Sequence, residues 1–88
     1  MEGLKDKVAI VTGGATMIGA QVARAFHHEG SRVVIADINE KDGQAIAKHL
    51  GPNALFVKTD LAIDAQVAAC VEKTAATFGG IDFLINLA

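Results

Sequence analysis

The sequence has 88 residues, a length that accommodates one small domain at most. Hydrophobic residues make up 51% of it and charged residues 20%, which is typical of a folded globular chain. Its 8 basic and 10 acidic side chains give a formal net charge of -2, which argues against nucleic-acid binding and against attachment to a membrane surface. The single cysteine, Cys70, excludes an internal disulfide, and no signal-peptide or membrane-span pattern is found, so we expect a cytoplasmic protein.

The N-terminal part of the sequence predicts a strand followed by a helix. Residues 8–12 form a short apolar run rich in β-branched side chains, which is typical of a buried strand. After the next loop the period changes, because Ile18, Val22 and Phe26 recur every four residues. This spacing predicts a helix with one face against a sheet, and Gly30 follows at the position of a C-terminal cap.

The same alternation continues through the middle of the sequence. Residues 32–36 predict a second buried strand that ends at Asp37, and Asn39 is suited to cap the helix that follows. That helix ends before residues 51–52, a glycine–proline pair that cannot continue it. Residues 54–57 then predict a third strand.

The last predicted elements are a helix over residues 64–78 and a strand over residues 81–85. We expect one side of this helix to be formed by its apolar residues Val67, Ala68, Val71, Ala75 and Phe78. Strands and helices that alternate in this way predict an α/β fold with a doubly wound parallel sheet of the Rossmann type. The fourth strand would pair with the first and leave its other edge bare. We therefore expect residues 1–88 to be an incomplete domain, completed by further chain or by a second polypeptide.

A glycine-rich loop lies between the first predicted strand and the first predicted helix, where unpaired N–H groups and the helix dipole favour a phosphate. Gly13 permits a tight turn there, and Gly19 permits the helix to pack closely on the sheet. The candidate cofactor-binding residues of this loop are Gly13, Ala15, Thr16, Met17, Ile18 and Gly19. Two glycines in a turn can also serve the turn alone, so this pattern needs a second signal.

Asp37 supplies the second signal. It ends the second predicted strand 24 residues after Gly13, close to the spacing at which an acidic side chain meets the ribose hydroxyls of a dinucleotide. A carboxylate there repels a 2′-phosphate, and neither Ala15 nor Ile38 offers a basic side chain to bind one. The sequence therefore favours NAD over NADP. The alternative is that Asp37 only caps the turn after its strand.

Four landmarks in order along the chain resemble the short-chain dehydrogenases/reductases. They are the glycine loop, Asp37, the pair Asp60-Leu61 and the segment Asn86-Leu87-Ala88. The resemblance implies that Asp60 contacts the adenine amino group beside the backbone of Leu61, and that Asn86 supports the central strand next to the cofactor. Ile38 and Ala88 complete the cofactor-binding residues that it implies. It also implies a hydride transfer between nicotinamide and an alcohol or ketone substrate, by a homo-oligomer (a dimer or a tetramer).

The sequence departs from the family pattern at two positions and lacks the family's catalytic residues. Met17 stands where the family usually has glycine, and Leu87 stands where it has a second asparagine. The resemblance implies acid–base catalysis by a tyrosine, assisted by a lysine and a serine. This sequence contains no tyrosine, and its only serine, Ser31, begins the second strand. We therefore assign no catalytic residue and no metal ligand within residues 1–88, and we expect the catalytic residues to lie outside them.

Two alternatives to the NAD-dependent oxidoreductase remain open on the sequence alone. A non-catalytic relative that binds NAD as a sensor or structural protein would keep the fold and lose the chemistry, and Met17 and Leu87 keep this reading open. An S-adenosylmethionine-dependent methyltransferase would also have a glycine-rich first turn and an acidic end to its second strand. The wide spacing between Gly13 and Gly19, together with the landmark at Asn86, favours the dehydrogenase.

Overall fold

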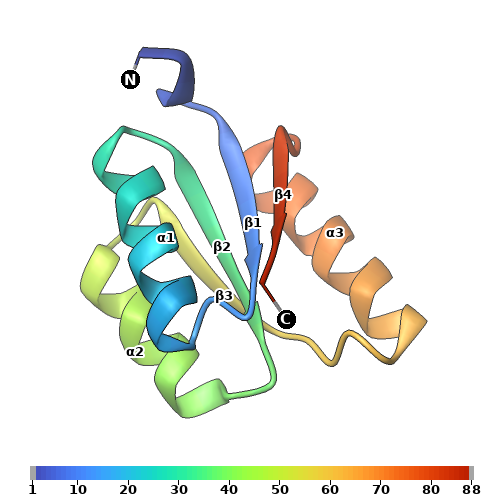
Figure 1. Ribbon diagram of the computed structural model, residues 1–88. Helices are drawn as coiled ribbons and strands as arrows, with labels where there is room; N and C mark the ends of the chain where they lie inside the picture. The colour runs from blue at the N-terminus through green and yellow to red at the C-terminus, as the bar shows by residue number, and fades with distance from the viewer. Residues whose placement is uncertain (1, 88) are drawn as a thin grey trace.

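The computed structural model describes residues 2–87, which contain a parallel four-stranded sheet (Figure 1). Its strands are β1 (Val8–Thr12), β2 (Arg32–Asp37), β3 (Ala54–Lys58) and β4 (Phe83–Asn86), in the order β3-β2-β1-β4. The expected pairing of the fourth strand with the first is confirmed, as is the doubly wound Rossmann-like architecture. Parallel neighbours require crossover connections, and the helices between the strands provide them.

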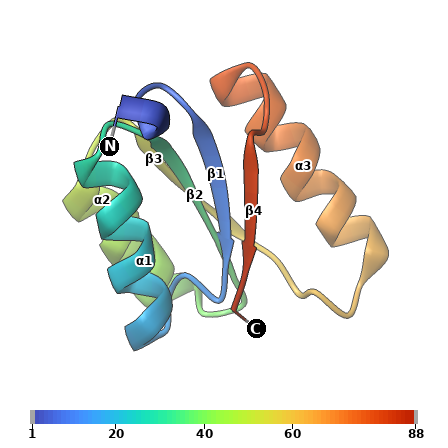
Figure 2. The same cartoon turned by 45° about the horizontal axis from the view of Figure 1, so that its top comes forward.

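The helices cover both faces of the sheet. They are α1 (Met17–His28), α2 (Glu40–Leu50) and α3 (Asp64–Phe78), and a short 3-10 helix, η1 (Glu2–Leu4), precedes β1. Figures 1 and 2 show α1 and α2 together on one face and α3 on the other. In the described part of the chain, no helix is both long enough and apolar enough to cross a membrane.

Side chains of the two central strands alternate between the two faces, as the pleat requires. Val11, Val33 and Ile35 point to the α1–α2 face and are fully buried there with Ala23 of α1. On the α3 face the buried cluster consists of Ile10, Val34, Ala36 and Cys70. Cys70 is therefore a small buried residue of this cluster.

The apolar side of α3 is only partly buried, because Phe78 packs against the cluster of the α3 face and Val67 is half-buried. Cys70 and Thr74 are its buried residues, whereas Ala68, Val71 and Ala75 are exposed. The buried Thr74 hydroxyl is satisfied because it donates to the Cys70 carbonyl oxygen at 2.8 Å. Val71 nevertheless lines a hollow with Cys70 and Leu84, so it is exposed on the sheet-facing side of the helix and not on the opposite side.

The fourth strand begins two residues later than expected, at Phe83, because Asp82 makes a different contact with β1. The Asp82 backbone N–H donates to the Val8 carbonyl, and its carboxylate Oδ2 accepts the Val8 N–H at 2.8 Å. Asp82 thus fixes the start of β4 against the start of β1. The carboxyl ends of β1, β2 and β4 then meet at one edge of the sheet, where the loops to α1 and α2 also lie (Figure 1).

Candidate functional site

The glycine-rich loop between β1 and α1 is held by its own hydrogen bonds. Gly13 has a positive φ of 70°, which glycine adopts without strain. Thr16 is the N-cap of α1: its hydroxyl donates to the Gly13 carbonyl at 2.7 Å and accepts the Gly19 N–H at 3.0 Å. One side chain therefore joins the turn to the first turn of the helix.

Gly19 is fixed by close packing. A Cβ atom at this position would overlap the carbonyl oxygen of Gly13 and would lie 2.8 Å from the Cα of Gly14. These are backbone atoms, so they cannot move aside as the end of a flexible side chain could. The close approach expected at Gly19 is therefore between the helix and the loop that follows β1.

Two N–H groups at the start of α1 are left for an external acceptor. Thr16 accepts the N–H groups of Gly19 and Ala20, through its hydroxyl and its carbonyl oxygen respectively. For Met17 and Ile18, whose N–H groups precede the first intrahelical bond, no partner is found among residues 2–87. Together with the helix dipole, these two donors favour an anion at this point.

The side chains of Met17 and Ile18 are the most exposed large apolar groups of the described chain, at 80% and 70%. For Ile18 this contradicts the expected packing against the sheet, where Val22 and Phe26 do pack. The buried residues of this first turn are Gly19 and Ala20, so Met17 and Ile18 lie on its outer side. Ile18 belongs to the exposed surface beside the loop, and its role as a site residue stays a prediction.

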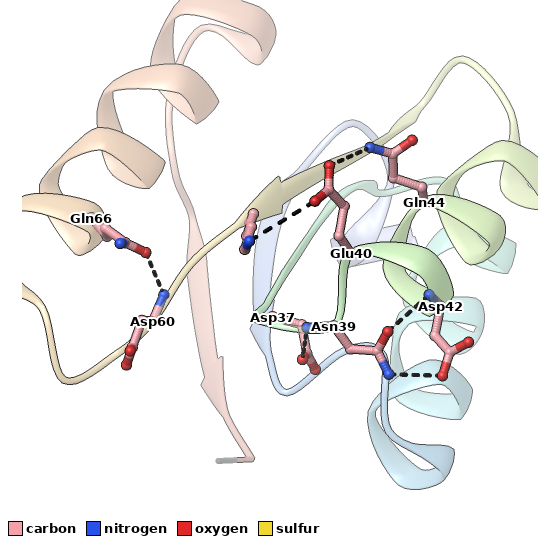
Figure 3. A network of polar contacts seen from close by, with 8 residues as sticks. Asp37, Asn39, Glu40, Asp42, Gln44, Asp60 and Gln66 are labelled. Atoms are coloured by element: carbon pink, nitrogen blue, oxygen red, sulfur yellow. Dashed lines mark hydrogen bonds and ion pairs between the residues drawn. The ribbon is translucent and has the colours of Figure 1, made fainter.

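Asp37 directly connects the end of β2 to the glycine-rich loop. Its Oδ2 accepts the backbone N–H of Ala15 at 3.1 Å, and its Oδ1 accepts that of Asn39 at 2.9 Å. Figure 3 shows Asp37 beside Asn39, which caps α2 through a bond from the Asp42 N–H at 3.1 Å. The carboxylate is thereby fixed at the edge of the loop, and it is only half-buried. The bond to Asn39 is the turn contact of the alternative interpretation, and the bond to Ala15 is a contact with the loop that the sequence did not predict.

A cleft of about 290 Å³ lies between the glycine-rich loop and the loop after β3. It is lined by Gly13, Thr16, Ala36, Asp37, Ile38, Thr59, Asp60 and Leu61. Ligand pockets generally start at about 300 Å³, so this cleft suits one nucleoside rather than a complete dinucleotide. A larger hollow of about 380 Å³ lies between the end of α2 and the start of β3. It is at the opposite end of the strands and has no acidic lining residue, so we do not assign the site to it.

Asp60 contributes to the cleft from the loop after β3. Its N–H donates to Gln66 Oε1 at 2.8 Å, and its Oδ1 accepts the Ala62 N–H at 3.0 Å. Figure 3 shows Gln66 reaching from α3 to the Asp60 backbone. Sequence reasoning selected Asp60 and missed Gln66. A glutamine three residues after the helix N-cap was the available signal.

A polar pair joins the end of the central strand β1 to the end of the edge strand β4. The hydroxyl of Thr12 on β1 donates to Oδ1 of Asn86 on β4 at 2.9 Å and accepts the Leu87 N–H at 3.2 Å. Thr12 is buried, whereas Asn86 and Leu87 are exposed. Asn86 thus lies beside β1, where the resemblance placed it. Ala88, the remaining candidate, lies outside the described residues.

The structure gathers the predicted residues at one edge of the sheet, in three neighbouring places. Asp37, Ile38, Asp60 and Leu61 line the cleft together with Gly13 and Thr16. Met17 and Ile18 surround the helix start beside it, and Asn86 lies next to β1. Two cleft residues, Ala36 and Thr59, were not predicted from the sequence, because neither has a side chain whose chemistry or spacing indicates a site.

Comparisons with known proteins agree with this geometry. The model of the family described as short chain dehydrogenase matches residues 7–88. Over 83 residues the chain is 46% identical to (+)-borneol dehydrogenase 1 of Salvia officinalis and 45% identical to tropinone reductase-like 2 of Erythroxylum coca. These matches cover 94% of this chain, but 32% and 30% of the two relatives. The chain thus spans about a third of their length.

A solved structure with the same arrangement is that of a 3-ketoacyl-(acyl-carrier-protein) reductase from Brucella melitensis, complexed with NADH. The TM-score is 0.90 at 36% sequence identity. The match covers 92% of this chain and 34% of the reductase chain. The segment that matches in sequence is therefore also the segment that matches in fold.

Proposed function

This chain belongs to the short-chain dehydrogenase family, and from that premise we propose that its described residues hold NAD in an oxidoreductase. The proposed reaction transfers a hydride between the nicotinamide and an alcohol or ketone substrate. The family uses NAD or NADP, and bound cofactor supplies the hydride chemistry. The residues of this chain supply binding and orientation.

The observation that carries the proposal is the carboxylate of Asp37 beside the glycine-rich loop. It is held by the N–H groups of Ala15 and Asn39 at the margin of the cleft. A carboxylate in this place accepts hydrogen bonds from ribose hydroxyls and repels a 2′-phosphate. Ala15 and Ile38 provide no positive charge that would offset the repulsion. The preference is therefore for NAD.

The other groups of the site fit the remaining parts of the same ligand. The free N–H groups of Met17 and Ile18 would receive the pyrophosphate at the start of α1. Ile38 and Leu61, exposed apolar residues of the cleft, would enclose the adenine. The Asp60 carboxylate would accept a hydrogen bond from the adenine amino group. Thr12 and Asn86 would support the strand ends beneath the cofactor.

The test is a fluorescence titration of the full natural protein with NADH and with NADPH. We expect NADH to bind at least about tenfold more tightly, because the charge repulsion costs more than 1.4 kcal/mol. In Asp37→Asn the preference should fall to about threefold or less, since the uncharged amide no longer repels the phosphate. Glu72→Gln, on the exposed surface of α3, removes the same charge elsewhere and should leave the preference unchanged.

Absence of any NADH binding by the wild-type protein would overturn the proposal. Binding without turnover of any alcohol or ketone would instead support the non-catalytic NAD-binding relative. The feature that favours this second candidate is Met17 at the anion-binding helix start, where its exposed side chain restricts the approach of the pyrophosphate.

A further inference from the structure

Asp60 has an anchor on α3 that the proposed function does not use. Its backbone N–H lies 2.8 Å from Oε1 of Gln66, a residue six positions further along the chain (Figure 3). This bond joins the cleft-lining loop directly to the first turn of a helix. The loop residues Leu61, Ala62 and Ile63 are all exposed, so packing does little to fix their conformation.

The start of α3 explains why Gln66 is available for this contact. Its N-cap is Ile63, whose side chain makes no capping hydrogen bond. In an ordinary capping box the third helical residue reaches back to the N–H of the N-cap residue. Here that N–H already donates to the Asp60 carbonyl at 3.0 Å, so Gln66 reaches past it to the Asp60 N–H. Gln66 therefore bonds to the loop residue Asp60 instead of to the N-cap residue of its own helix.

Three polar groups of Asp60 are fixed as a result. Its N–H donates to the Gln66 side chain, its carbonyl oxygen accepts the Ile63 N–H, and its Oδ1 accepts the Ala62 N–H. For the second carboxylate oxygen, Oδ2, no hydrogen-bond partner is found among residues 2–87. Asp60 lines the cleft, so this oxygen is an acceptor of fixed position beside the space assigned to the base.

We propose that Gln66 is a positioning residue for base recognition: by holding the Asp60 backbone it sets the carboxylate to select an adenine amino group over a carbonyl oxygen. This inference rests on the proposed NAD site and adds to it a residue outside the cleft lining. The physical basis is that a carboxylate only accepts hydrogen bonds. It therefore attracts the 6-amino group of adenine and repels the 6-carbonyl of hypoxanthine.

The test compares NADH with its hypoxanthine analogue, reduced nicotinamide hypoxanthine dinucleotide, on the full natural protein. We expect the wild type to bind NADH about tenfold more tightly, the effect of one hydrogen bond to a charged group. Gln66→Leu replaces the acceptor with an apolar side chain of similar size. It should reduce this preference to about twofold, mainly by lowering the affinity for NADH. Gln66→Glu keeps an acceptor oxygen and should restore most of the preference.

A matched control is Gln44→Leu. Gln44 is an exposed glutamine of α2 whose side chain makes only a long contact of 3.4 Å to Glu40, and the substitution should leave the tenfold preference in place. If Gln66→Leu fails to fold, Gln66→Asn, which is polar but too short to reach Asp60, makes the same comparison.

Equal weakening of both ligands in the Gln66 variants would overturn the inference, because it would indicate general damage to the loop. A wild type that binds both dinucleotides equally would overturn it too, while leaving the NAD site intact. A wild type that binds neither would be a failure of the proposed function itself, so the two outcomes are distinct.

Discussion

The two faces of the sheet differ in how completely they are covered. On the α1–α2 face, Val33 and Ile35 are inaccessible to solvent, and even the peripheral Phe83 of β4 has a partner in Phe26 of α1, with ring centroids 6.0 Å apart. On the α3 face, Leu84 of β4 is 66% exposed and Val71 of α3 is 44% exposed. Both faces therefore have a buried cluster, but on the α3 face apolar side chains of β4 and α3 remain exposed.

This difference shows which parts of the site are held by contacts within the described residues. The glycine-rich loop, Gly19 and Asp37 are all held by elements that belong to the α1–α2 side or to its edge. The site geometry therefore depends on contacts within residues 2–87. On the α3 face, in contrast, Leu84 and Val71 contribute little burial, and an exposed apolar surface of this kind favours association.

The largest expected effect comes from Ile35→Ala in the 88-residue chain. Ile35 is fully buried, so the substitution should cost about 4 kcal/mol, most of the stability of so small a domain. Leu84→Ala removes a side chain of the same composition from the α3 face and should cost less than about 1 kcal/mol. Urea unfolding followed by circular dichroism measures both. Equal losses would show that the α3 face is covered in solution and would break the comparison.

Gly19→Ala should have the next largest effect, this time on the site as well as on stability. The added methyl group overlaps backbone atoms of the loop, so we expect a loss of roughly 3 kcal/mol in unfolding free energy and of most NADH binding. Gly80→Ala is the control, since a Cβ there would meet no atom within 4 Å. An NADH titration in which Gly19→Ala binds like the wild type would contradict the close packing of loop and helix.

Thr12→Val should have a smaller effect, confined to the junction of β1 and β4. The isosteric change removes the hydroxyl that bonds Asn86 and Leu87, which should cost about 1–2 kcal/mol. A double-mutant cycle with Asn86→Ala separates this bond from other effects. Additive losses in the two single variants would mean that the pair does not couple the strands.

The smallest expected effect belongs to Met17→Ala. Because the methionine side chain is 80% exposed at the start of α1, its removal should leave stability within about 0.5 kcal/mol of the wild type. It should also open the helix start to the pyrophosphate and tighten NADH binding by about threefold. Weaker binding in the variant would instead show that the thioether side chain contacts the cofactor favourably.

Much of the fold could be predicted from the sequence because its signals are local. The switch between strand and helix periods located every main element, and the predicted α3 limits of residues 64–78 agree with the structure. The glycine loop and Asp37 could be selected because each follows directly from the end of a strand. The wrong prediction concerns which way a side chain faces: Ile18 of α1 is exposed, although its spacing predicted packing against the sheet.

The amino-acid sequence by itself determined the order of elements, the parallel sheet and the location of the loop, since hydrophobic period and turn residues act over a few positions. Only the tertiary structure decided which residues that are distant in the sequence contact one another. Parallel register placed Thr12 opposite Asn86, and the return of the chain along β2 brought Asp37 to Ala15. The N-cap Ile63 makes no side-chain capping bond, and Gln66 accepts the Asp60 N–H there. These contacts join positions whose spacing carries no periodic signal, so they emerge only when the crossovers have packed.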